Sequence, residues 1–154
     1  MDIKDIVEPE GVLSSLNATS KKHLLQELAQ RAEDVLGVKA RDAFDAMLER
    51  ERLGPTGMGR GVAIPHARVE GLQGIGGLFA SLQRPVEFES MDDEPVDLVF
   101  ALFAPEDAGA DHLRALARIS RRLRDPNVCA KLRSADHSSA IYAVLTENTD
   151  AKAA

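Results

Sequence analysis

The sequence predicts a single α/β domain with a mixed central β-sheet flanked by helices on both sides. Its length of 154 residues is that of one domain with a real hydrophobic core. Apolar residues recur at helical spacing toward both ends of the chain, whereas apolar runs typical of strands fill the middle. Strands and helices do not alternate regularly, so a doubly wound sheet is not expected. The domain is expected to span residues 1–146, with a flexible polar tail at 147–154.

Helices are expected to come first along the chain. Residues 17–20 supply capping oxygens, apolar residues then follow at helical spacing, and Gly37 ends this first helix. A second helix is expected over residues 41–52, and Gly54-Pro55 ends its periodicity.

The middle of the chain is expected to hold the strands. Residues 54–61, GPTGMGRG, contain four glycines and a proline and predict a loop. Strands are expected at 62–64, 75–82 and 96–103, and the last of these is a nearly continuous apolar run typical of the buried centre of a sheet. Residues 84–88 include a proline and indicate an edge strand or a turn into the acidic loop SMDDEP.

Helices are expected again after the strands. One begins near Asp111 and ends before Pro126, where the proline cannot continue it. Two shorter helices are expected at residues 128–132 and 139–145. The buried positions of the first of these helices are expected to be Leu113, Leu116, Ala117, Ser120 and Leu123.

Charge and composition limit the kinds of molecule that the protein is expected to bind and the compartment in which it is expected to lie. The formal net charge of −6 argues against binding to nucleic acid or to an anionic membrane, because both depend on an excess of Lys and Arg. The single cysteine, Cys129, cannot form an internal disulfide, and the start MDIKDIVEPE lacks the pattern of a signal peptide. The longest apolar run, 98–104, is too short to span a membrane. We therefore expect a cytoplasmic protein whose partners are proteins or small molecules.

Several familiar site motifs do not fit this chain. Gly54 and Gly59 have the spacing of a P-loop, but Arg60 and Gly61 replace the required Lys and Ser/Thr. The dinucleotide motif G-x-G-x-x-G and the nucleophile-elbow motif G-x-S-x-G are absent. The four histidines and Cys129 do not stand at metal-ligand spacing, so neither a metal nor another cofactor is expected.

Among the histidines, His66 is the best candidate for a functional group. Pro65 fixes the backbone before it and a short strand leads in, so the imidazole is held on rigid backbone. His23 and His137 lie in polar surroundings and are expected at the surface without a role. His112 is expected at the start of a helix, where the helix dipole favours the neutral ring. On the residues alone, a structural histidine remains the alternative for His66.

Three separated blocks of the chain resemble a known family. RERLGPTGMGRGVAIPH, PVDLVFAL and DHLRALARIS are similar, in that order, to the mannitol/fructose-type IIA family of the bacterial phosphotransferase system, and within it to the nitrogen-regulatory members. The resemblance covers nearly the whole chain. It implies an α/β domain with helices around a mixed sheet, and a histidine that takes a phosphoryl group from a phosphorylated HPr-like carrier protein.

The resemblance also assigns the site residues. It makes His66 the phosphorylated nucleophile and places His112 beside it, as a hydrogen-bonding partner of the phosphoryl group or of the ring. Arg50 would supply positive charge, and Thr56 would be a donor at the edge of the pocket. Transfer between two imidazoles needs in-line geometry and cationic or hydrogen-bonding groups around the phosphoryl oxygens, and these residue types meet that need without a metal.

Three functions stay open at this point. The resemblance favours a cytoplasmic phosphocarrier, a phosphotransferase component that regulates target proteins of nitrogen or potassium metabolism according to its phosphorylation state. The alternatives are a sugar-specific IIA component that passes phosphate to a IIB domain for mannitol or fructose uptake, and a non-catalytic sensor or interaction module. A basic stripe on the helix after His112 is either a solvated face or a docking surface for an acidic target or an anionic nucleotide. Its members are Arg114, Arg118, Arg121 and Arg122.

Overall fold

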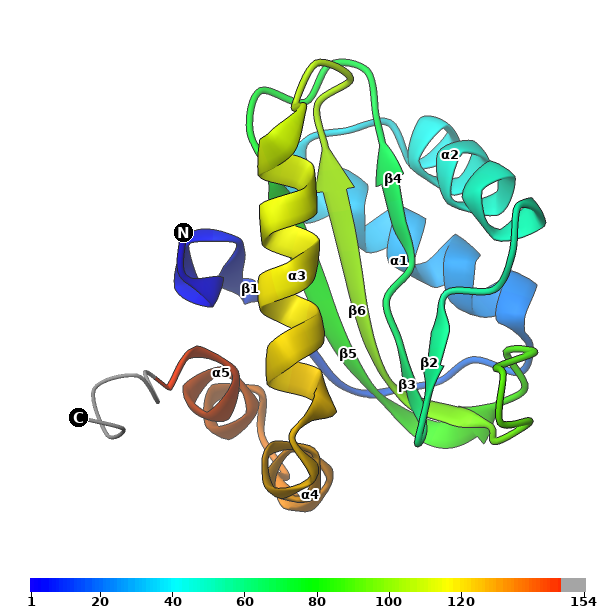
Figure 1. Cartoon of the computed structure of the whole chain (residues 1–154), viewed down its shortest axis with the longest axis vertical. Helices are drawn as coiled ribbons and strands as arrows, with labels where there is room; N and C mark the ends of the chain where they lie inside the picture. Colours follow the sequence, from blue (N-terminus) through cyan, green and yellow to red (C-terminus); the bar gives the residue numbers. More distant parts are fainter. Residues whose placement is uncertain (148–154) are drawn as a thin grey trace.

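A six-stranded mixed sheet lies at the centre of the computed structural model, which describes residues 1–147 (Figure 1). The predicted α/β fold with helices on both faces of one sheet is confirmed. Along the chain the elements are the 3₁₀ helix η1 (Ile3–Asp5), β1 (Val7–Leu16), α1 (Lys21–Leu36), α2 (Ala40–Arg52), β2 (Gly57–Gly59), β3 (Val62–Ala63), β4 (His66–Arg68), β5 (Gly76–Val86), β6 (Val96–Ala104), α3 (Ala110–Arg124), α4 (Pro126–Ser134) and α5 (Ser138–Thr146).

Strand β6 is the centre of the sheet, as its apolar run predicts. It pairs antiparallel with β5 on one side and parallel with both β3 and β4 on the other. β1 extends the sheet beyond β5 in the parallel sense, and β2 extends it beyond β3 in the antiparallel sense. Because β6 is buried on both faces, its own position is fixed, and the strands that pair with it are held in place by their hydrogen bonds to it.

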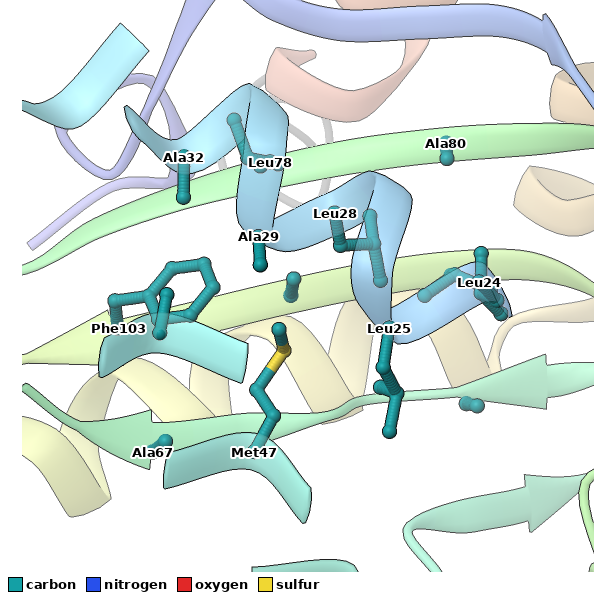
Figure 2. Packing of buried hydrophobic residues seen from close by; sticks show 14 of the residues in the cluster. Leu24, Leu25, Leu28, Ala29, Ala32, Met47, Ala67, Leu78, Ala80 and Phe103 are labelled. Atoms are coloured by element: carbon teal, nitrogen blue, oxygen red, sulfur yellow. The ribbon is translucent and has the colours of Figure 1, made fainter. Parts of the chain in front are cut away.

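Alternation along β6 divides the core into two clusters. Val99, Ala101 and Phe103 face the layer formed by α1 and α2, whereas Leu98 and Phe100 belong to the cluster under α3, α4 and α5. Figure 2 shows the first cluster, with the apolar side chains of α1 and α2 lying over the sheet. Full burial of an aliphatic or aromatic side chain contributes about 1.5–3 kcal/mol, so both helical layers are bound mainly by the hydrophobic effect.

The two N-terminal helices follow the predicted signals. Ser20 caps α1 by accepting a hydrogen bond from the backbone N–H of His23. Gly37 ends the helix in the left-handed conformation at φ 78°, which glycine adopts without a steric penalty. α2 begins one residue before the predicted range and ends at Arg52, as predicted.

The prediction that helices come first is wrong, because β1 precedes them. This ten-residue strand lies at the edge of the sheet, and its buried residues, Val7, Gly11, Val12 and Leu16, do not alternate with exposed ones. Register shifts interrupt its pairing with β5, and Ser15 has a φ of 54°. These irregularities break the period-two pattern that marks a half-buried strand.

The predicted loop at 54–61 contains a short strand. β2 pairs with β3, and the turn between them passes through Arg60 and Gly61, both with positive φ. Arg133 holds this turn by donating to the carbonyl oxygen of Arg60 at 2.8 Å and to the carboxylate of Asp97. The glycine content therefore marks a tight hairpin. The segment 84–88 likewise differs from its prediction as a separate edge or turn, since β5 continues to Val86.

The predicted buried face of α3 is correct at Leu123, and Leu116 is partly buried, but the prediction is wrong at the start of the helix. His112, Ala115, Ile119 and Leu123 are buried, whereas Leu113 is 67% exposed. The sequence prediction followed the leucines and counted His112 as polar, but the histidine faces inward and sets the phase of the helix. The end of α3 before Pro126 and the two short helices after it are confirmed.

Two further expectations concern the ends of the chain and membranes. The predicted tail, 147–154, lies outside the described residues except for Glu147. Within residues 1–147, each helix is too short or too polar to cross a bilayer.

Candidate active site

His66 is the first residue of β4 and follows the short break that separates β3 from β4 along the same side of β6. β3 and β4 pair with successive parts of β6, and the residues between them are Ile64 and Pro65. The backbone N–H of Ile64 donates to the carbonyl of Thr56 at 3.1 Å, and the carbonyl of Pro65 accepts from Leu102 at 2.9 Å. The backbone on the N-terminal side of His66 is therefore fixed, as expected for a residue on rigid backbone.

The hydrogen bonds of the His66 ring identify its reactive nitrogen. Nδ1 lies 2.8 Å from the carbonyl oxygen of Ile64, and a carbonyl can only accept, so Nδ1 carries the hydrogen. Nε2 accepts a hydrogen bond from Nε of Arg50 at 3.3 Å, so it holds the lone pair. The ring is half-buried. Nε2 is therefore the nitrogen that can act as a nucleophile.

The surroundings of His66 favour its neutral form. Burial lowers the pKa of the imidazole below its ordinary value, and the positive charge of Arg50 lowers it further. The hydrogen bond to Ile64 and the negative charge of Glu51 oppose this shift by raising the pKa. Because the net direction is downward, the ring is neutral and nucleophilic near pH 7.

His112 lies beside His66, as the resemblance implied. The ring centroids are 5.7 Å apart and the rings meet edge to face at 80°. His112 is buried, and its Nε2 has no hydrogen-bond partner among residues 1–147. Burial also lowers the pKa of the His112 ring, and electrostatic interactions with His66 and Arg68 lower it by smaller amounts. A buried ring nitrogen without a partner is uncommon and indicates a position where a ligand group can bind.

Arg50 links the end of α2 to the His66 ring. While its Nε donates to His66, its terminal Nη1 donates to the carbonyl oxygen of Gly54 at 2.9 Å. The planar guanidinium is thus held with one edge against the imidazole. Its positive charge lies at the position where negative charge would accumulate on a group attached to Nε2.

Thr56 was predicted to be a hydrogen-bond donor at the edge of the pocket, but in the structure its hydroxyl is directed to Glu51. Its hydroxyl donates to the carboxylate of Glu51, and its backbone N–H donates to the same carboxylate at 3.1 Å. Sequence reasoning missed Glu51, although one signal was available. An acidic residue in the last turn of a helix opposes the helix dipole, which hints at a specific partner elsewhere.

The predicted basic stripe on α3 is not one continuous exposed surface. Arg122 is turned inward, with its side chain 9% exposed, and donates to the carbonyl of Val144 at 2.6 Å. Arg118 pairs with Asp2 at 3.1 Å, across to the start of the chain, and Arg114 pairs with its helical neighbour Asp111 at 3.2 Å. These arginines help to join α3 to η1 and α5 and to balance nearby carboxylates.

Sequence comparison places the chain among characterised proteins. The family model described as "Phosphoenolpyruvate-dependent sugar phosphotransferase system, EIIA 2" matches residues 5–148. A nitrogen regulatory protein of Bradyrhizobium diazoefficiens is 55% identical over 145 residues, which are 94% of this chain and 95% of the relative. The nitrogen regulatory protein of Escherichia coli is 34% identical over 96% of this chain and 91% of its own length. A fructose-specific EIIA component of Haloferax volcanii is 35% identical over 96% of this chain and 98% of its own.

Solved structures agree with this placement. The nitrogen regulatory protein IIA-Ntr of Neisseria meningitidis superposes with a TM-score of 0.88 at 32% identity, covering 94% of this chain and 99% of the other. The mannitol IIA protein of E. coli gives a TM-score of 0.75 at 23% identity, covering 90% of this chain and 97% of the other, and shares the fold. Together with the arrangement of His66, His112 and Arg50, these likenesses show that the chain belongs to the EIIA type 2 family of the phosphoenolpyruvate-dependent phosphotransferase system.

Proposed function

We propose that the protein is a cytoplasmic phosphocarrier that accepts a phosphoryl group on Nε2 of His66 from a phosphorylated HPr-like protein. Depending on its phosphorylation state, it regulates target proteins of nitrogen or potassium metabolism. The observation that carries the proposal is the geometry of the His66 ring, which is held at Nδ1 by Ile64 and faces the Arg50 guanidinium at Nε2. This arrangement provides a nucleophile and a positive charge in one place.

The transfer step needs little chemistry beyond positioning. The Nε2 lone pair of His66 attacks phosphorus while the bond from phosphorus to the donor histidine breaks, and the donor nitrogen takes back the electron pair. The acceptor ring gains positive charge as the new N–P bond forms. The carbonyl oxygen of Ile64, which accepts from Nδ1–H, stabilises that charge.

Arg50 and His112 serve the phosphoryl oxygens. In the resting site Arg50 caps the lone pair of Nε2, so its Nε must exchange His66 for a phosphoryl oxygen during transfer. The bond from Nη1 to Gly54 can persist and keep the guanidinium near the reacting centre. The unpartnered Nε2 of His112 can donate to a second phosphoryl oxygen when it carries the hydrogen, which satisfies a buried polar atom.

Exposed apolar residues next to the site suit a docking protein. Leu53 follows the helix that supplies Arg50 and is 82% exposed, and Leu113 follows His112 in sequence and is also exposed. Large exposed leucines beside a reactive group provide apolar contact area for a partner. The phosphoryl group adds about two negative charges to His66, which is enough to change an interface with a target by local electrostatics.

The comparisons support a regulatory function over the alternatives. The relative with 55% identity is named a nitrogen regulatory protein. One observation keeps the sugar-specific function as a second candidate, namely the 35% identical fructose-specific EIIA component of H. volcanii. A non-catalytic module on the same fold has no need for a neutral histidine beside an arginine and a second histidine.

The proposal is tested by phosphorylation in solution. The protein is incubated with phosphoenolpyruvate and the upstream carriers, and its mass is followed. We expect a gain of one phosphoryl group that is labile in acid and stable in base, and no gain in His66→Gln. Absence of the gain in the wild-type protein, or an equal gain in His66→Gln, would refute the phosphocarrier function.

A second experiment separates the regulatory from the sugar-specific function. The phosphorylated protein is mixed with purified IIB domains for mannitol and fructose, and transfer of the phosphoryl group is followed. In addition, the phosphorylated and unphosphorylated forms of the protein are compared in pull-downs from cell extract. For a regulator we expect slow transfer to the IIB domains and a set of bound proteins that differs between the two forms. Fast transfer with identical bound proteins would instead favour the sugar-specific component.

A further inference from the structure

A buried ion pair lies directly behind the candidate active site. Glu51 follows Arg50 in the last turn of α2, and its side chain is only 4% exposed. Its Oε2 accepts from Nζ of Lys21 at 2.9 Å and from the backbone N–H of Thr56 at 3.1 Å, while Oε1 accepts from the Thr56 hydroxyl. Three donors therefore converge on one buried carboxylate.

We infer that the buried side chain of Glu51, through its hydrogen bonds to Thr56, is a positioning element of the phosphoryl-acceptor site, which fixes Thr56 and through it the groups that orient His66 and Arg50. The inference rests on the proposed function, because it concerns the reaction at His66. Glu51 acts through other residues and is a positioning residue in this scheme, and Lys21 balances its buried charge.

The first connection runs through backbone groups to the His66 ring. Glu51 holds Thr56 at both its N–H and its hydroxyl, and the Thr56 carbonyl accepts the N–H of Ile64 at 3.1 Å. The carbonyl of the same Ile64 accepts Nδ1–H of His66 at 2.8 Å. A displacement of Thr56 would therefore move the acceptor that selects the tautomer of the nucleophile.

The second connection runs through the loop between α2 and β2. Arg50 is anchored on the carbonyl of Gly54, which lies between the helix end and Thr56. Glu51 fixes the far end of that short segment at Thr56. The neighbouring side chains of Arg50 and Glu51 therefore hold the loop at Gly54 and at Thr56. Without the hydrogen bonds from Thr56 to Glu51, the loop could move, and with it the Gly54 carbonyl that keeps the Arg50 guanidinium beside His66.

The placement of the two charges argues that stability alone does not explain them. Lys21 is in the first turn of α1 and Glu51 in the last turn of α2, and each has the sign that the dipole of its own helix disfavours. Buried ion pairs often add little to stability compared with apolar residues of similar volume. Lys21 also lies 4.5 Å above the ring of Phe88, which fixes its ammonium group over the core.

Two charge-neutral variants test the inference. Lys21→Met/Glu51→Leu removes the ion pair and every acceptor for Thr56. Lys21→Met/Glu51→Gln also removes both charges but keeps an amide oxygen that can accept from Thr56. The matched control is Arg52→Met/Glu49→Leu, which deletes an exposed ion pair with a 3.1 Å separation from the same helix. Circular dichroism establishes folding before the kinetics of phosphorylation are measured with the purified carrier.

We expect the leucine variant to lose about 10-fold to 100-fold in kcat with little change in KM, because a small misplacement of reacting groups is costly. The glutamine variant should recover most of the rate, and the control should match the wild-type protein. Equal rates in the leucine and glutamine variants would overturn the inference. If the leucine variant does not fold, Thr56→Val replaces it, and an unchanged kcat in that variant would overturn the inference equally.

An NMR measurement separates this inference from the proposed function. The ¹⁵N shifts of His66 report which ring nitrogen carries the hydrogen, and they require no phosphoryl transfer. We expect the Nδ1–H form to dominate in the wild-type and glutamine proteins and a mixture of tautomers in the leucine variant, or in Thr56→Val where that replaces it. If the wild-type protein is never phosphorylated, the proposed function fails, while the tautomer result still decides whether Glu51 positions the ring.

Discussion

The Nε atom of Arg50 donates to Nε2 of His66 at 3.3 Å, so the nitrogen proposed as the nucleophile is capped by the charge that would receive the phosphoryl oxygens. The same guanidinium is held by the carbonyl of Gly54 at 2.9 Å. One arginine thus has two functions in the proposed reaction. It adds to the effect of burial in lowering the pKa of the imidazole before transfer, and it is already in position to share negative charge when the N–P bond forms.

Replacing Arg50 is expected to slow phosphorylation strongly. Arg50→Ala removes the charge that stabilises the phosphoryl oxygens, and its rate should fall by about 10²-fold to 10³-fold. Arg50→Lys keeps the charge but cannot donate to His66 and Gly54 with one rigid plane, so it should recover the rate only in part. The rate is measured by mass spectrometry with limiting carrier. Arg52→Ala, an exposed arginine in the same turn, is the control and should behave as wild type.

The titration of His66 should occur below the ordinary histidine value of about 6.5. Burial is the main cause and Arg50 adds to it, so Arg50→Ala should raise the pKa. The folded ring binds a proton less readily than the unfolded one. The free energy of unfolding should therefore fall as the pH drops from about 6.5 to the lowered pKa and then level off. NMR titration and urea denaturation check these trends, and a His66 midpoint above 6.5 would contradict them.

The parts of the fold that the sequence predicted are those with strong local patterns. α1 has a capping serine, regular apolar spacing and a glycine stop, and β6 is an unbroken apolar run. β1 escaped prediction because an edge strand with two register shifts loses the period of two. The prediction was wrong at the start of α3, because the burial of His112 beside His66 is a tertiary contact that local spacing does not report.

His66 was a candidate from its rigid backbone surroundings, and the family resemblance added His112, Arg50 and Thr56. His66, His112 and Arg50 fall on the blocks of this resemblance, and the folded chain brings them together. Glu51 was not predicted because a charged residue at a helix end usually lies in solvent. Its burial depends on the packing of α1 against α2, which brings Lys21 to its carboxylate. That contact joins elements whose relative placement a single sequence does not specify.

Replacing His112 is expected to slow phosphoryl transfer. A hydrogen bond from its Nε2 to a charged phosphoryl oxygen would contribute about 1.5–3 kcal/mol, so His112→Ala should slow phosphorylation by about 10-fold to 100-fold. His112→Gln keeps a donor and should be milder. Quench-flow or mass spectrometry measures the rates. Equal rates in the wild type and His112→Ala would show that this ring does not contact the phosphoryl group.

The core between the sheet and α1 should respond strongly to truncation. Leu28 is fully buried against the sheet face shown in Figure 2, and Leu28→Ala should lower the free energy of unfolding by about 2–5 kcal/mol. Because Leu28 is not among the residues of the site, the rate of phosphorylation of the folded variant should change little. Urea denaturation gives the stability. A loss below 0.5 kcal/mol, the size of a typical surface effect, would contradict the packing described here.

The two exposed leucines that lie close in sequence to Arg50 and His112 should affect carrier binding without affecting stability. Leu53 and Leu113 are 82% and 67% exposed, so replacing either by serine should change the free energy of unfolding by less than about 0.5 kcal/mol. If the HPr-like carrier docks around His66, each variant loses apolar contact area and its KM should rise several-fold while kcat stays similar. Met91→Ser, at a residue 93% exposed in the acidic loop, is the matched control and should leave KM unchanged. A KM that rises in the control but not in the two leucine variants would place the docking surface on the acidic loop instead.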